Sequence, residues 1–184
     1  ADDRGVDLQF ARIQAKNVFT GSMSDIFGKW VPQDWIQRIF DTVKENPQWN
    51  FLFLTKFPQR LQEVNDILGG FPDNVWVGTS VDTQVRVKVA EKAFKGISAR
   101  LKWLSCEPML EELTFNDLSG FDLVVIGGAS ASKETDGTPA TPEFQPKWEW
   151  VYSLTKQAYD AGCSVYWKEN LKTRPKEFPL DQIQ

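Results

Sequence analysis

Three charged residues stand at the ends of strand-sized apolar segments, where parallel α/β proteins place their chemistry. They are Lys56, Glu107 and Lys168. Because the carboxyl ends of parallel strands meet at one edge of a sheet, we expect these side chains to share one mouth. There, Glu107 would orient hydroxyl groups of a ligand, and the two lysines would bind its carboxylate or phosphate. We predict that these three residues are the catalytic candidates.

Smaller polar residues and a glycine pair follow other strand-like segments. Ser80 ends one of them, and Gly127 with Gly128 ends another, where consecutive backbone N–H groups can form a nest for an anion. We assign these three residues to cofactor binding. Ser22 and Asp25 follow the first apolar segment, and we assign them to substrate binding. No residue is predicted to bind a metal ion.

Each of these candidates also has an ordinary structural explanation. The stem of a strand-end lysine such as Lys56 or Lys168 often packs while its ammonium group reaches water. Glu107 precedes Pro108 and could pair locally, and the serines and Asp25 are common turn and cap residue types. A glycine pair is also a usual way to leave a strand. Both explanations stay open at this stage.

The composition excludes several classes of function. The 184 residues contain no histidine, which excludes Ser-His-Asp and Cys-His catalysis. The net charge is −4, with 21 basic and 25 acidic residues, and it predicts no broad surface for nucleic acid. One basic run interrupts this balance, and we interpret it as a solvated face. Its members are Arg86, Lys88, Lys92, Lys95, Arg100 and Lys102.

The elements that must position the candidates alternate between short apolar strands and amphipathic helices. Helices are expected after Pro32, Pro58 and Pro146, and a further helix after Asp82, which we predict to be its N-cap. The connection at 107–122 is expected to have a short helix or none. The expected strands lie near 18–19, 51–54, 75–79, 101–106, 123–126 and 165–167, with a weaker candidate at 6–10.

Near-continuous apolar strands separated by helices predict a parallel sheet covered by helices. The fold class is therefore α/β, with a parallel (β/α) barrel-like sheet that is incomplete or open and resembles a TIM barrel. We expect strands in sequential order, and a gap between the first and last strands. The N-terminal segment, a loop or a second copy of the chain would cover that gap. The polar loop at 129–145 is expected to be mobile without ligand.

The whole chain, residues 1–184, is predicted to be one domain. The apolar runs are much shorter than the roughly 20 residues needed to cross a bilayer, and no signal-peptide pattern opens the sequence.

The two cysteines, Cys106 and Cys163, are too few for a disulfide framework. Cys106 is more typical of a small buried hydrophobe than of a nucleophile. We therefore expect a cytoplasmic protein, and the start at Ala1 suggests the C-terminal portion of a longer one.

Six motifs together resemble, in order and spacing, a phage-associated family of unknown function. Its members are similar to radical S-adenosylmethionine (SAM) enzymes, with a TIM-barrel-like core and an N-terminal three-cysteine motif for an iron–sulfur cluster. The resemblance implies that Lys56, Ser80, Glu107 and Lys168 are matched polar positions. The motifs are VFTGSMSDIFG (18–28), FLFLTKFPQRL (51–61), VWVGTSVD (75–82), LKWLSCEPML (101–110), LVVIGGAS (123–130) and VYWKEN (165–170).

The departures from this family limit what the resemblance implies. Its cysteine motif would lie before residue 1, and two cysteines cannot supply the three thiolates of such a cluster. We therefore expect no iron–sulfur cluster in this chain, and SAM is the candidate cofactor. Phe57 stands where the family tends to have Arg, and Ala129 where it tends to have Glu, so ligand contacts near these positions would differ.

Three functions compete at this stage. The first is the barrel portion of a radical-SAM-like enzyme that lacks its cluster-binding segment. The second is a non-catalytic module that binds a nucleotide, a nucleic-acid end or a protein partner. The third is a lysine-based TIM-barrel enzyme that uses Lys56 or Lys168 as a Schiff-base or general-base group. An anionic small molecule or a nucleotide is the expected small ligand, and no membrane partner is expected.

Overall fold

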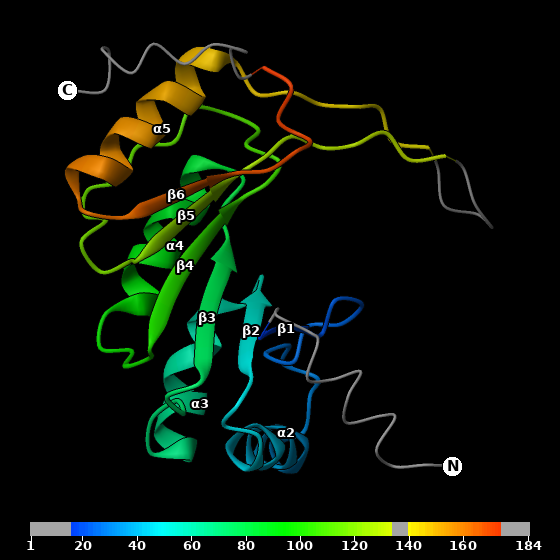
Figure 1. Ribbon diagram of the computed structural model, residues 1–184, viewed down its shortest axis with the longest axis vertical. Helices are drawn as coiled ribbons and strands as arrows, with labels where there is room; N and C mark the ends of the chain where they lie inside the picture. The colour runs from blue at the N-terminus through cyan, green and yellow to red at the C-terminus, as the bar shows by residue number, and fades with distance from the viewer. Residues whose placement is uncertain (1–15, 134–139, 174–184) are drawn as a thin grey trace.

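A computed structural model describes residues 16–133 and 140–173 (Figure 1). Its centre is one sheet of six strands, in the order β1-β2-β3-β4-β5-β6. All neighbouring strands are parallel, so the predicted parallel sheet in sequential order is confirmed. The strands are β1 Asn17–Thr20, β2 Asn50–Thr55, β3 Val75–Ser80, β4 Leu101–Cys106, β5 Leu123–Ile126 and β6 Ser164–Trp167.

Helices occupy the connections at the predicted places. Pro32 precedes the first helix, and Pro58 opens a short 3-10 turn. Gly69 ends the helix at 61–68 in the left-handed conformation, with φ 67°. Glycine adopts this conformation without steric cost. The elements are α2 Gln33–Glu45, η1 Pro58–Arg60, α3 Leu61–Leu68, α4 Gln84–Phe94 and α5 Trp148–Asp160.

The predicted N-cap of α4 is wrong. The capping position belongs to Thr83, whose side chain makes no capping hydrogen bond, and the N–H of Gln84 donates to the carboxylate of Glu111. Asp82 instead forms an ion pair with Arg86, at 3.1 Å from carboxylate oxygen to guanidinium Nε. The helix start is therefore satisfied by a carboxylate from the connection that follows β4.

The two faces of the sheet have different surroundings. Phe53, Val77 and Leu104 belong to the core that packs against the helices. Because side chains alternate along a strand, the residues between them lie on the opposite, inner face of the curled sheet. There Gly78 pairs with Trp103, and a Cβ on Gly78 would lie 2.4 Å from that indole ring. Glycine is required because the ring lies against the backbone.

Two connections are irregular. Residues 107–122 contain no helix, as predicted, and bury Leu113 and Leu118 in the core. Residues 129–133 and 140–144 form an arm that leaves the sheet, with Ala129 paired with Phe144 and Ser132 with Thr141, and the chain then continues into α5 (Figure 1). Residues 134–139 of this arm lie outside the described residues, and its mobility stays a prediction.

The sheet is an open half-barrel with β1 and β6 at its edges (Figure 1). This confirms the predicted incomplete, barrel-like α/β fold. The weaker strand candidate at 6–10 lies outside the described residues, and what covers the edges is not tested. Within the described part of the chain, no helix has the length and apolar character needed to cross a membrane.

Candidate functional site

An ion pair joins the ends of β4 and β6 on the inner face of the sheet. Lys168 Nζ lies 2.7 Å from Glu107 Oε1 and 2.8 Å from Oε2, so the ammonium group bridges both carboxylate oxygens. The Glu107 side chain is 22% exposed and that of Lys168 is 40% exposed. The pair is therefore partly desolvated and still reachable from solvent. Strand-end reasoning correctly anticipated that these two residues meet.

Asn170 completes this group. Its Nδ2 donates to Glu107 Oε1 at 3.0 Å and to the carbonyl of Gly128 at 2.7 Å. Its Oδ1 is buried and has no hydrogen-bond partner. An unpaired buried acceptor costs on the order of 1–3 kcal/mol, so this oxygen favours any donor that enters beside it. We name Glu107, Lys168, Asn170, Gly127 and Gly128 the mouth cluster.

The glycine pair lets these side chains approach the end of β5. A Cβ on Gly127 would lie 3.0 Å from Asn170 Oδ1 and 3.1 Å from Glu107 Cγ, and a Cβ on Gly128 would lie 2.7 Å from the carbonyl oxygen of Phe144. Both positions are buried. The pair therefore serves packing, whereas the anion-binding nest expected from its sequence is not tested.

Gln145 fixes the chain that carries Asn170. Its Nε2 donates to the carbonyl of Asn170 at 2.9 Å, and its Oε1 accepts from the N–H of Lys172 at 2.8 Å. Lys172 Nζ also lies 2.6 Å from a carboxylate oxygen of Glu143, and this contact holds the Glu143 pKa below its ordinary value. The returning arm and the segment after β6 are thus tied together beside the mouth cluster.

Asp25 lies beside β1 and β2, far along the sheet edge from the mouth cluster. Both of its carboxylate oxygens already accept hydrogen bonds. Its carboxylate accepts from the Thr55 hydroxyl at 2.8 and 3.0 Å, from the N–H of Lys56 at 2.7 Å and from the N–H of Phe27 at 3.1 Å. The Thr55 hydroxyl is in turn the acceptor for the N–H of Phe57. Asp25 therefore fastens the loop after β1 to the end of β2.

The remaining predicted residues are not in contact with the mouth cluster. Lys56 follows β2, so three strands separate it from Lys168, a distance of about 19 Å along the sheet. The Lys56 side chain is exposed, Ser80 is half-buried and Ser22 is exposed. In the described ranges, no hydrogen bond or ion pair connects these three residues to Glu107 or Lys168.

The comparisons with known proteins give one match. Residues 3–178 match the family described as "Protein of unknown function (DUF5131)". The chain belongs to this family. Comparisons with curated proteins and with solved structures find no match.

The two cysteines of this chain decide whether an iron–sulfur cluster fits its residues. Cys106 and Cys163 are both buried, and burial raises the pKa of each thiol above its ordinary value. Cys106 lies on the helix-covered face of β4, and Cys163 precedes β6. Such a cluster needs three thiolates, and this chain has only two cysteines. The buried surroundings of both cysteines disfavour the thiolate form, so the cluster does not fit the residues of this chain. Within the described ranges no group of three or more His, Cys, Asp or Glu residues could hold a metal ion.

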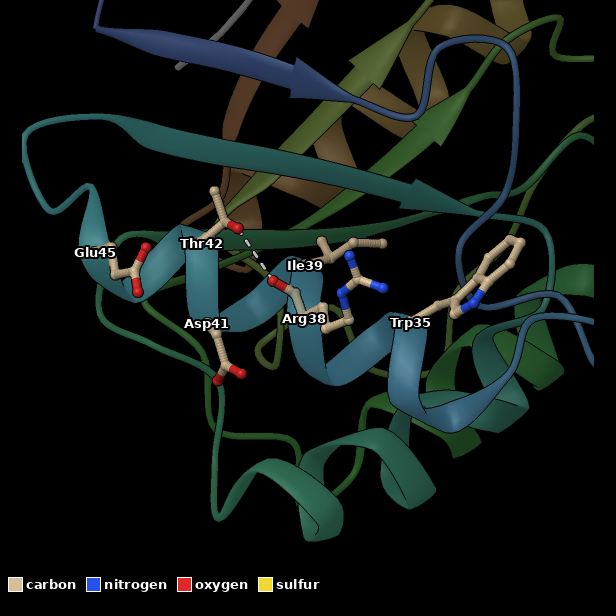
Figure 2. A pocket seen from close by; sticks show the side chains of 6 residues that line it. All are labelled: Trp35, Arg38, Ile39, Asp41, Thr42 and Glu45. Atoms are coloured by element: carbon tan, nitrogen blue, oxygen red, sulfur yellow. Dashed lines mark hydrogen bonds between the residues drawn. The ribbon is translucent and has the colours of Figure 1, made fainter.

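A hollow of about 530 Å³ lies on α2, away from the mouth cluster (Figure 2). Figure 2 shows that its lining residues come from this one helix, on which the Thr42 hydroxyl donates to the carbonyl of Arg38 at 3.1 Å. Trp35 is 58% exposed at its rim. None of the predicted site residues lines this hollow, and it shows no convergence of groups from separate elements.

Sequence reasoning missed two functional positions. Asn170 is two residues beyond Lys168, in the turn that follows β6, where the alternation of strand side chains no longer fixes its direction. Gln145 offered no signal, because its role depends on the arm returning beside the end of β6. Both act through polar contacts between segments far apart in the sequence.

Proposed function

We propose that the mouth cluster binds a small ligand that carries both an anionic group and hydrogen-bond donors, such as a nucleotide or SAM. The observation that carries this proposal is the Glu107 carboxylate, held by Lys168 and Asn170 at the carboxyl edge of β4 and β6. A partly exposed ion pair beside an unpaired buried acceptor favours a ligand that has both charge and donors.

Each residue of the cluster has a distinct part in this proposal. Glu107 accepts from ligand hydroxyl or amino groups, and Lys168 neutralises the ligand carboxylate or phosphate. Asn170 Oδ1, which has no hydrogen-bond partner within the protein, accepts a further ligand donor. The backbone of Gly127 and Gly128 forms the adjacent wall.

The other predicted positions have secondary parts along the same edge. Lys56, Ser80 and Ser22 would contact a ligand long enough to extend toward β2 and β3. Asp25 would act indirectly, because its acceptors are already used to hold the backbone at Lys56.

The resemblance supports a finer proposal, in which the chain is the barrel portion of a phage-related, radical-SAM-like enzyme. In that case this chain contributes SAM binding and orientation, and the cluster is not assigned to its residues. The alternative is a binding module without catalysis, for a nucleotide, a nucleic-acid end or a protein partner.

Isothermal titration calorimetry with SAM, AMP, ATP and inorganic phosphate tests the proposal. We expect binding of at least one of the organic ligands, with affinity lowered about tenfold or more, equal to about 1.4 kcal/mol, in Glu107→Gln and in Lys168→Ala. Lys156→Ala is the matched control, since it removes a lysine from a 2.6 Å surface ion pair with Asp160. Unchanged affinity in both mouth variants, or no binding by the wild-type chain, would sink the proposal.

A further inference from the structure

The structure separates the basic run of residues 86–102 into parts with different surroundings. Arg86 is paired with Asp82, and Arg100 lines a separate hollow at the amino ends of the strands. Three lysines instead converge on a groove of about 710 Å³ between α4 and the wall formed by η1 and α3. We name it the lysine groove. Its lining residues are Gln59, Gln62, Lys88, Val89, Lys92, Ala93 and Lys95.

All charged residues that line the lysine groove are cations. Three of its lining residues carry ammonium groups and none carries a carboxylate. Within the part of the chain that the structure describes, Lys88 and Lys92 form no ion pair. They are four residues apart on α4, an arrangement of like charges that destabilises a helix by roughly 0.2–0.5 kcal/mol.

The nearby carboxylates are engaged elsewhere. Glu63 pairs with Arg60 at 3.5 Å, Asp66 accepts from Gln62 at 2.7 Å, and Glu91 accepts from the N–H groups of the connection after β4. Hydrogen bonds from the Ser119 hydroxyl and N–H hold the Asp117 pKa below its ordinary value, and the charge of Lys95 adds a smaller effect in the same direction. The positive charge of the groove therefore faces solvent.

Apolar surface lies beside these charges. Val85 is 76% exposed and Val89 is 39% exposed, and both lie on one face of α4, four residues apart. Ala93 continues the same line and is half-buried. An apolar stripe flanked by cations in a groove between helices is the form that amphipathic acidic segments recognise.

We propose that the lysine groove docks an acidic peptide segment of a partner protein. The partner places one apolar side chain against Val89 and Ala93, and its carboxylates face Lys88, Lys92 and Lys95. The amides of Gln59 and Gln62 on the other wall satisfy the partner backbone. This surface is separate from the mouth cluster and does not depend on the proposed function.

The dimensions and charges favour a peptide over nucleic acid. Lys88 and Lys95 are seven residues apart, about 10 Å along the helix axis. Nucleic-acid binding gains affinity by neutralising many phosphates over a longer track. Here three lysines over this length can neutralise only a few phosphates.

Fluorescence anisotropy with a labelled peptide of repeated Glu-Leu-Glu-Glu units tests this inference. We expect the wild-type chain to bind it, and the triple variant Lys88→Glu, Lys92→Glu, Lys95→Glu to bind it about tenfold more weakly or worse. The matched control is Lys16→Glu, Lys44→Glu, Arg100→Glu, which changes the charge equally at the separate hollow at the amino ends of the strands. This control should remain within about twofold of wild type.

Two further measurements keep the inference falsifiable. Val89→Ser, which leaves the charge unchanged, should weaken binding of the same peptide by about threefold or more, and circular dichroism checks that every variant is folded. If charge reversal prevents folding, the triple Lys→Gln variant replaces it. No binding by wild type, an equal loss in the control triple, or tighter binding of an oligothymidylate than of the peptide would each overturn the inference.

Discussion

The carboxyl edge of the sheet carries two carboxylates with opposite situations. Asp25, beside β1 and β2, accepts from three donors of its own chain, one of them the Thr55 hydroxyl, and Thr55 is only 1% exposed. Glu107, beside β4 and β6, is held by two side chains, one of which is 40% exposed and the other of which retains an unpaired oxygen. The same residue chemistry thus stabilises the fold at one corner and is open to a ligand at the other.

The largest loss of stability is expected when the Asp25 carboxylate is removed. Asp25→Ala removes the acceptor of the Thr55 hydroxyl and of two backbone N–H groups, so we expect the free energy of unfolding to fall by about 3 kcal/mol. Urea denaturation followed by circular dichroism measures it. Asp41→Ala is the control, because Asp41 accepts only from the exposed Gln37 side chain. A loss no larger than that of the control would contradict the structural role of Asp25.

The glycine pair gives the next largest effect. In Gly128→Ala the new methyl group would meet a backbone oxygen at 2.7 Å, whereas in Gly127→Ala it would meet side-chain atoms at 3.0–3.2 Å. Side chains move more easily than backbone, so we expect losses of about 2 and about 1 kcal/mol respectively in urea denaturation. Gly120→Ala is the control, since its Cβ would meet nothing within 4 Å. The reverse order for the two glycines would show that the Glu107 and Asn170 side chains yield less readily than the backbone at Phe144.

The Glu107 corner should contribute little to stability. Glu107→Gln and Lys168→Ala each leave a partner that water can reach, so we expect the free energy of unfolding to change by less than about 1 kcal/mol. A double-mutant cycle in urea, repeated at high salt, measures the coupling and its screening. A coupling as large as the loss in Asp25→Ala would mean that both corners are structural.

The smallest effect at neutral pH concerns Cys106, the residue before Glu107. Burial raises the Cys106 pKa, so the folded state keeps the proton that the unfolded chain releases above its ordinary value of 9.0. This stabilising contribution is complete below that pH and declines as the pH rises beyond it. The urea midpoint should therefore fall above about pH 9 more in wild type than in Cys106→Ala. Equal declines would contradict a raised pKa of the Cys106 thiol in the folded state.

The sequence predicted the elements more completely than their contacts. The strands and helices follow from apolar periodicity and from prolines and glycines at their boundaries, which are local signals. The meeting of Glu107 and Lys168 was also predictable, since both follow parallel strands on the inner face. The cap of α4 was not, because the carboxylate of Glu111 reaches Gln84 from a separate connection. Asn170 depends likewise on how the chain turns after β6.

The sequential strand order has a consequence for how the protein is made. Each strand pairs only with the strand before and the strand after it in the chain, so the sheet can grow from its first strand while the ribosome is still adding residues. Glu107 is synthesised 61 residues before Lys168. Its carboxylate therefore stays hydrated until β6 emerges, and the ion pair with Lys168 can form only after β1 to β5 have been synthesised.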